Sequence, residues 1–237
     1  MALPINSTPT YTLTIPSTEK LVKYRPFLIK EEKSLLIAQQ SEDPMVMVES
    51  LKDVIKSCIK DEVDVDKLAT FDLEYIFTQI RAKSVGEIVE LFLKCDTCTD
   101  EKAVAKVNID LTTIKVEKSA EHTNKIELFD DVGIQLKYPT MDVIKKLESA
   151  NQSDIESVFG IVVDCIDFIY TSSEVFHAKE QTKQELMEFL NNLTSDQFIK
   201  VQKFFETIPR LKQEITYACP VCGKVHNKVL EGLNSFF

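Results

Sequence analysis

Four of the six cysteines of this chain form two Cys-x-x-Cys pairs that lie far apart in the sequence. The pairs are Cys95 with Cys98 and Cys219 with Cys222, and 120 residues separate Cys98 from Cys219. A two-residue spacer lets both sulfurs of a pair point at one ion, and two pairs supply the four thiolates of a tetrahedral site. If one ion joins the pairs, the residues between them form an insertion whose two ends meet.

Segments predicted as strands flank each pair. Alternating apolar residues at 87–94 and 103–111 flank the first pair, and strand-like segments at 211–217 and 225–230 flank the second. Gly223 directly follows the second pair and can adopt the positive φ that turns backbone amides toward the sulfurs, whereas Thr99 takes that place in the first pair.

The sequence therefore predicts a split zinc ribbon, with one structural Zn²⁺ per chain bound by Cys95, Cys98, Cys219 and Cys222. The ion would hold the two ends of the insertion together at its base. Four thiolates close the coordination shell, so no position remains for a catalytic water.

Other interpretations of the cysteines and histidines stay open. The pairs could be redox dithiols or buried thiols without a role, although no thioredoxin-like context accompanies them. His226, four residues after Cys222, is a candidate substitute ligand, but its strand position favours an ordinary histidine. Cys58 and Cys165 lie on predicted apolar helix faces and are expected to be small buried side chains.

The remaining sequence predicts an α+β fold of small antiparallel hairpins with a helical insertion. Hydrophobic periodicity and turn residues divide it into an extended arm at 1–10, an α+β region at 11–139 that holds the first cysteine pair, a helical subdomain at 140–210, and the second cysteine hairpin with a tail at 211–237. No internal repeat is apparent beyond the similarity of the two cysteine hairpins.

Several helix starts are readable from capping residues. Asp43 before Pro44 and Thr70 are expected N-caps. Capping boxes begin at Ser153, Thr182 and Thr194, and the apolar run at 155–169 after the first of them is predicted as one helix.

Composition excludes several function classes. A net charge of −10 repels phosphate backbones, so nucleic acid is not expected as a partner. The five glycines stand alone, so no phosphate-binding loop can be drawn, and no hydrolase motif occurs. The N-terminus has no signal-like region, and Asp164 and Asp167 interrupt the longest apolar stretch. We therefore expect an intracellular protein without enzymatic activity, membrane segment or small-molecule substrate.

The first 110 residues resemble the baseplate hub and hub-assembly proteins of T-even-type contractile-tailed bacteriophages. The resemblance is carried by Tyr24-Arg25-Pro26-Phe27, Lys30-Glu31-Glu32-Lys33 and the segments 71–77 and 80–87. It implies a hub subunit or hub-assembly factor that contacts other baseplate or hub proteins, in the host cytoplasm during assembly or in the tail baseplate of the virion. The alternatives are a zinc-ribbon adaptor in transcription or nucleic-acid transactions and, less in keeping with the sequence, a hydrolase that uses surface carboxylates.

Two segments are candidate contacts for such partners. In the predicted helix at 71–87, one face is apolar, and the other is expected to expose Asp72, Tyr75, Gln79 and Lys83 with Arg81 on its flank. Tyr75 and Arg81 would be the anchors, unless Arg81 and Lys83 only complement the helix C-terminus. At the chain end, Phe236 and Phe237 form an apolar tail that needs a docking surface.

Overall fold

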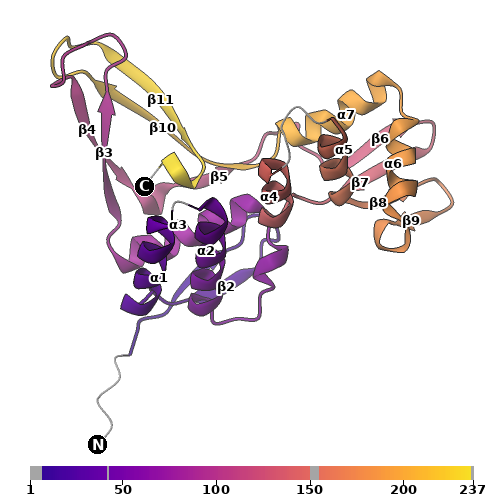
Figure 1. Cartoon of the computed structure of the whole chain (residues 1–237), viewed down its shortest axis with the longest axis horizontal. Coiled ribbons are helices and arrows are strands. Elements are labelled where there is room, and N and C mark those ends of the chain that lie inside the picture. Colours follow the sequence, from indigo (N-terminus) through magenta and orange to yellow (C-terminus); the bar gives the residue numbers. More distant parts are fainter. Residues whose placement is uncertain (1–6, 42, 150–154, 236–237) are drawn as a thin grey trace, which may run out of the picture. The chain divides into compact units, whose positions relative to one another are not determined.

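The computed structural model describes residues 7–41, 43–149 and 155–235. The chain divides into two compact units, the first formed by Met1–Glu117 with Arg210–Phe237 and the second by Lys118–Pro209. Each unit has its own strands, helices and apolar core (Figure 1). All strand pairs in the described part of the chain are antiparallel, which confirms the α+β class. No helix within the described ranges is long and apolar enough to cross a membrane.

The first unit opens with a β-hairpin that leads into three helices. Its elements are β1 (Tyr11–Thr14), β2 (Leu21–Tyr24), α1 (Ile29–Gln40), α2 (Pro44–Cys58), the 3-10 turn η1 (Val65–Lys67) and α3 (Thr70–Ser84). The predicted Asp43 cap of α2 is confirmed, since its carboxylate accepts the N–H of Met45 at 2.8 Å. Thr70 does not cap α3. Ala69 occupies the N-cap position, and Asp72 accepts the Ala69 N–H at 3.3 Å.

Helix α3 is surrounded by the rest of the first unit, so the prediction of one exposed face was wrong. Asp72 is fully buried because the β1–β2 turn covers it, and its carboxylate accepts the N–H of Ser17 at 2.9 Å. Gln79 is also buried, and its amide donates to the carbonyl of Leu111 at 3.2 Å. The polar groups of Asp72 and Gln79, which the helical pattern places on the outer face, thus find their hydrogen-bond partners within the protein and not in water.

Two further hairpins extend side by side from the first unit (Figure 1). One is β3 (Ile88–Lys94) with β4 (Val104–Asp110), and the other is β10 (Arg210–Ala218) with β11 (Val225–Glu231). Their inner faces share a core that includes Leu93, Ile109, Ile215 and Leu230. We call these four strands the double hairpin. The short strand β5 (Lys115–Glu117) completes a sheet in the order β11–β10–β5.

The second unit is a four-stranded sheet with helices, and it differs from the helical segment expected at 140–210. It contains β6 (Lys125–Phe129), β7 (Val132–Leu136), α4 (Met141–Ser149), α5 (Ile155–Asp164), β8 (Ile166–Tyr170), β9 (Val175–His177), the 3-10 turn η3 (Ala178–Glu180), α6 (Lys183–Asn191) and α7 (Ser195–Glu206). The sheet order is β6–β7–β8–β9, and residues of the sheet and of α5, α6 and α7 form one core. The unit starts at Lys118, before β6, rather than at residue 140.

The apolar run at 155–169 is not one helix. The helix ends at Asp164, and Ile166 begins β8, where Ile169 pairs with Ile134 of β7. Positions 162, 166 and 169 fit a helical face, and pairing with β7 decides between helix and strand. The capping boxes at Thr182 and Thr194 are confirmed, whereas Ser153 lies outside the described residues.

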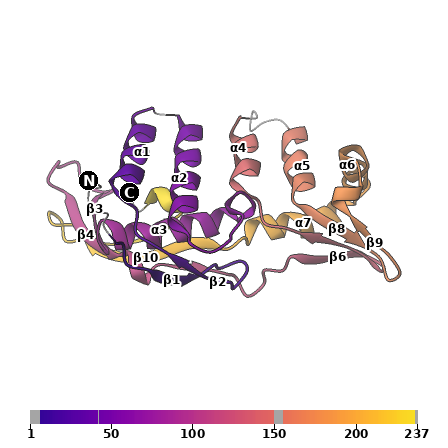
Figure 2. The same ribbon diagram turned by 90° about the horizontal axis from the view of Figure 1, so that it is seen from below.

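The two units repeat one succession of elements, a relationship that the sequence did not reveal. Each has a β-hairpin and a pair of helices, after which the chain returns to the hairpin at a Cys-Ile dipeptide. A 3-10 turn follows, and the next helix begins five residues after the first residue of that turn. In Figure 2, the helix pairs α1–α2 and α4–α5 each rise from the strands of their own unit. The carbonyl of Cys58 accepts the N–H of Arg25 at 3.0 Å, and that of Cys165 accepts the N–H of Lys137 at 2.8 Å.

Both of these cysteines are fully buried, as predicted. Burial raises the pKa of Cys58 to about 11 and that of Cys165 to about 12, because a thiolate is poorly solvated there. These two thiols are therefore protonated side chains of the cores and not reactive groups.

Candidate metal centre

The far end of the double hairpin holds the two Cys-x-x-Cys pairs. Cys95 directly follows β3 and donates its N–H to the carbonyl of Ala103 at 2.8 Å, which closes the first turn. Cys219 directly follows β10 and donates its N–H to the carbonyl of Lys224 at 2.8 Å. Gly223 has φ +71° and donates to the Cys219 carbonyl at 3.0 Å, so glycine is required in this turn. In both turns the first cysteine thus donates its N–H to the residue that precedes the returning strand.

The four sulfurs lie together. The Sγ atoms of Cys95 and Cys222 are 3.9 Å apart, as are those of Cys98 and Cys219, and all four lie within 4.8 Å of one another. A disulfide would require about 2.05 Å, so all four are free thiols. Four sulfurs at about 2.3 Å from a central Zn²⁺ form a tetrahedron with edges of about 3.8 Å. The spacing of the sulfurs therefore fits a four-coordinate metal ion.

The apolar cluster at the tips of the two hairpins is small. Cys95 and Cys219 are buried with Ala103 and the half-buried Cys98 in a small cluster, separate from the core of the double hairpin, and Cys222 is exposed. The sulfurs are thus the main apolar content of this end. An ion between them would take the place of a core.

The surroundings shift the pKa values of these thiols in different directions. Hydrogen bonding from Thr97, whose hydroxyl is 3.1 Å away, lowers the pKa of Cys95 to about 5. The backbone N–H of Lys224 lowers the pKa of Cys222. The sulfur of Cys222, which shares a hydrogen bond with Cys98, raises the pKa of Cys98 to about 12. Thiolates are the metal-binding form, and the contacts of Cys95 and Cys222 shift both groups toward it.

The position of the cluster corrects one expectation about the insertion. The ends of the second unit do meet, because Glu117 of β5 pairs with Arg210 of β10. However, Cys219 follows the opposite end of β10, about 26 Å away at a rise of about 3.3 Å per residue. An ion held by the cysteines would therefore join the tips of the double hairpin and would not staple the base of the insertion.

His226 and Asp96 lie beside the cluster. The Nε2 atom of His226 is 3.3 Å from the Sγ of Cys95, and its Nδ1 is 3.3 Å from an oxygen of Asp96. The ring of His226 stacks on Tyr217 with ring centres 5.0 Å apart. His226 is grouped with Cys95 and Asp96 and not with the four sulfurs, so the geometry does not favour the alternative in which His226 replaces one cysteine as a ligand. The sequence did not lead us to predict Asp96 as part of this site, although its position between Cys95 and Cys98 could have indicated it.

The two predicted partner residues on α3 are only partly exposed. Tyr75 is half-buried and packs against the core of the double hairpin, and Arg81 is half-buried, with burial lowering its pKa. Phe236 and Phe237 lie outside the described residues.

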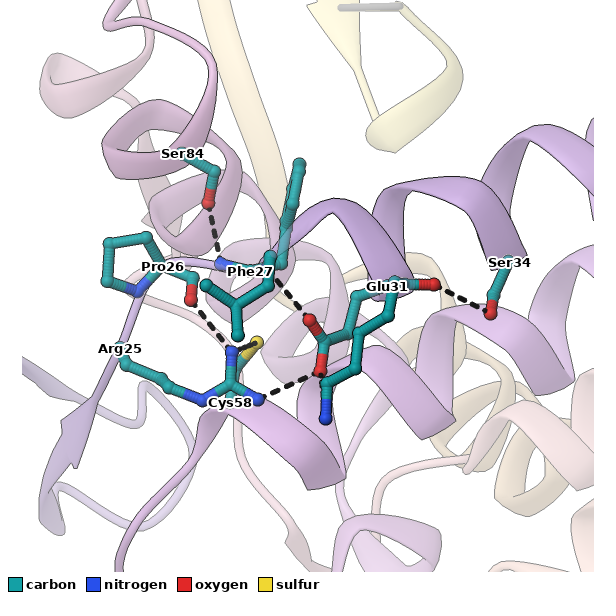
Figure 3. A network of polar contacts seen from close by, with 9 residues as sticks. Arg25, Pro26, Phe27, Glu31, Ser34, Cys58 and Ser84 are labelled. Carbon is teal, nitrogen blue, oxygen red and sulfur yellow. Dashed lines mark hydrogen bonds and ion pairs between the residues drawn. The ribbon is translucent and has the colours of Figure 1, made fainter. Parts of the chain in front are cut away.

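Three residues of the Tyr24-Arg25-Pro26-Phe27 segment, Arg25 to Phe27, have structural tasks (Figure 3). The guanidinium of Arg25 contacts Glu31 at 2.9 Å and donates to the carbonyl of Pro26 at 2.9 Å. Glu31 also accepts the N–H of Leu28 at 2.7 Å, and the N–H of Phe27 donates to Ser84 at 2.9 Å. Burial opposes the charge of Glu31, but the hydrogen bonds outweigh it and lower the pKa of Glu31. The segment thus fixes the start of α1 against α3.

The comparison with known proteins agrees with this description. The family described as T4 bacteriophage base plate protein matches residues 8–237. The baseplate hub assembly protein gp26 of Enterobacteria phage T4 is 24% identical over 228 residues, which cover 96% of this chain and 97% of that protein. No solved structure matches the chain. Since the match extends over both units and the cysteine cluster, the chain belongs to the T4 bacteriophage base plate protein family.

Proposed function

We propose that this protein promotes assembly of the baseplate hub of a contractile phage tail, acting through contacts with other baseplate proteins and not as an enzyme. The observation that carries the proposal is the relationship to the hub assembly protein of phage T4 over nearly the whole length of both chains. A shared function is better supported by such a match than by one confined to a single unit. The site of action would be the host cytoplasm during assembly, or the tail baseplate if the protein stays in the particle.

We also propose that the four cysteines bind one structural Zn²⁺. The spacing of the sulfurs supports zinc, and four thiolates leave no open position for chemistry. Binding of structural zinc contributes on the order of 10 kcal/mol in small modules. In this chain the ion would keep the tips of the double hairpin together, so that the outer faces of both hairpins are presented to a partner as one rigid element.

For the partner contacts themselves, Tyr75 and Arg81 on α3 and the terminal Phe236 and Phe237 remain our candidates. A partner could contact the exposed parts of the Tyr75 and Arg81 side chains. Nucleic acid, membranes and small-molecule substrates are not part of the proposal, in keeping with the net charge of −10.

The test is isolation of an affinity-tagged copy from infected cells, followed by mass spectrometry of its partners and of finished particles. We expect hub and baseplate proteins among the partners. Presence in finished particles would identify a hub subunit, and absence from them an assembly factor. If the partners are components of transcription or nucleic-acid processing and no baseplate protein is recovered, the zinc-ribbon adaptor replaces this proposal.

A further inference from the structure

We propose that His226 is a positioning residue of the metal centre, which donates its Nε2–H to the thiolate of Cys95 and is itself held by stacking on Tyr217. This inference rests on the proposed zinc site and extends it from four residues to an outer shell. It assigns to His226 a task that its sequence position alone does not indicate, since a strand position four residues after Cys222 favours an ordinary histidine.

The distances place His226 outside the coordination shell but in contact with it. Nε2 lies 3.3 Å from the Cys95 sulfur, which is a hydrogen-bonding distance for a sulfur acceptor. Among the described residues, only Cys95 of the four ligands is paired with this ring. A metal-bound thiolate is an acceptor, so the ring nitrogen that faces it is the donor.

The ring is held from its other sides. His226 is only 9% exposed, because it belongs to the inner face of β11, where Tyr217 is its direct cross-strand partner. The two rings stack with an angle of 18°. An oxygen of Asp96 lies 3.3 Å from Nδ1, and Lys224 lies 3.4 Å from the same oxygen. Burial and the stacked ring of Tyr217 therefore restrict the orientation of the imidazole, so that Nε2 stays directed at the Cys95 sulfur.

The charges around the site explain why a donor is useful there. A zinc ion with four thiolates carries two negative charges, and the chain as a whole is already at −10. Hydrogen bonds to the sulfurs spread this charge and orient each ligand, and outer-shell partners of this kind typically change metal affinity 10- to 100-fold. Thr97 supplies one such contact to Cys95, and His226 supplies a second from the opposite hairpin. The contact also ties β11 to the turn after β3 independently of the ion.

Two variants separate hydrogen bonding from ring packing. His226→Phe keeps a ring to stack on Tyr217 and removes the donor. His226→Gln removes the ring and can place an amide N–H near the position of Nε2. The full-length wild type and both variants are loaded with Co²⁺ as a spectroscopic substitute for zinc, and their affinity is measured by competition with a chromophoric chelator. Equal thermal unfolding of the metal-free proteins serves as the control for folding.

We expect one tetrahedral Co²⁺ per chain in all three proteins, because His226 is not a ligand. His226→Phe should bind the ion 10- to 100-fold more weakly and should shift the sulfur-to-cobalt charge-transfer band to lower energy, since the Cys95 thiolate loses a donor. His226→Gln should recover most of both properties. The inference is overturned if His226→Phe matches the wild type in affinity and spectrum, or if it loses tetrahedral binding altogether, which would make His226 a ligand. A wild type that binds no metal would instead overturn the zinc site itself.

Discussion

Arg210 and Glu117 face each other across β10 and β5, so the second unit leaves and re-enters the first unit at adjacent points. The pairing explains how one metal centre can be assembled from two cysteine pairs with 120 residues between them. The chain builds one hairpin of the double hairpin, completes a separate unit with its own core, and returns beside β5 to build the other. The metal centre belongs entirely to the first unit.

The second unit should therefore be removable. We predict that deleting residues 118–209 and joining Glu117 to Arg210 through a two-residue Asn-Gly turn leaves the first unit folded, because the joined residues are a direct antiparallel pair. Circular dichroism and the metal content of the shortened chain are the measurements. An insoluble product, or a folded one that has lost the metal affinity of the full chain, would show that the first unit depends on the second.

Glycine at position 133 should be essential to the second unit. A Cβ at Gly133 would collide with the ring of Tyr170 and lie 2.7 Å from the carbonyl of Ile126, so Gly133→Ala should lower the free energy of unfolding by roughly 1–3 kcal/mol. Gly160 is the matched control, since a Cβ there meets nothing within 4 Å on helix α5. Gly160→Ala should stabilise by about 0.5–1 kcal/mol. Urea unfolding of both variants is decisive, and equal effects at the two glycines would contradict the packing of Tyr170.

The contact between Arg25 and Glu31 should contribute to stability in a pH-dependent way. Glu31→Gln is expected to cost roughly 1–3 kcal/mol at pH 7, because it leaves the guanidinium of Arg25 partly buried without its carboxylate. The folded state lowers the pKa of Glu31, so its contribution is complete above the unfolded pKa of about 4.3 and is lost as pH falls through the lower folded value.

Unfolding of the wild type and of Glu31→Gln at several pH values tests this relation. Their difference should shrink between about pH 5 and the acid limit of folding. Glu32→Gln, the neighbouring half-exposed residue, is the control and should change stability by less than about 0.5 kcal/mol. A difference between wild type and Glu31→Gln that stays constant down to the acid limit would mean that the ionised carboxylate is not the stabilising group.

Local patterns predicted local structure well. The Cys-x-x-Cys spacing and the alternating residues around it placed both cysteine turns correctly, because a short turn is determined by neighbours in sequence. Asp43 and Thr182 capped helices as expected, whereas α3 begins one residue earlier than expected and has Ala69 in place of Thr70 at its N-cap.

Errors arose where distant segments decide the environment. The burial of Asp72 depends on Ser17, and that of Gln79 on Leu111, neither of which is visible from the helical pattern of α3. Likewise, Ile166 and Ile169 fit a helix until β7 offers them a strand to pair with. The repeat of the two units was hidden because equivalent positions such as Tyr24 and Leu136 share their place in the hairpin and not their side-chain chemistry.

The most direct test of the metal centre is the ratio of zinc to protein in the purified full-length chain. We predict one zinc per chain in the wild type and in Cys58→Ala, whose thiol lies in a separate core, and a loss of zinc in Cys98→Ser and Cys219→Ser, because each removes one of the four thiolates. A wild type without zinc, or serine variants that retain one zinc per chain with the fold intact, would contradict a site shared by the two distant cysteine pairs.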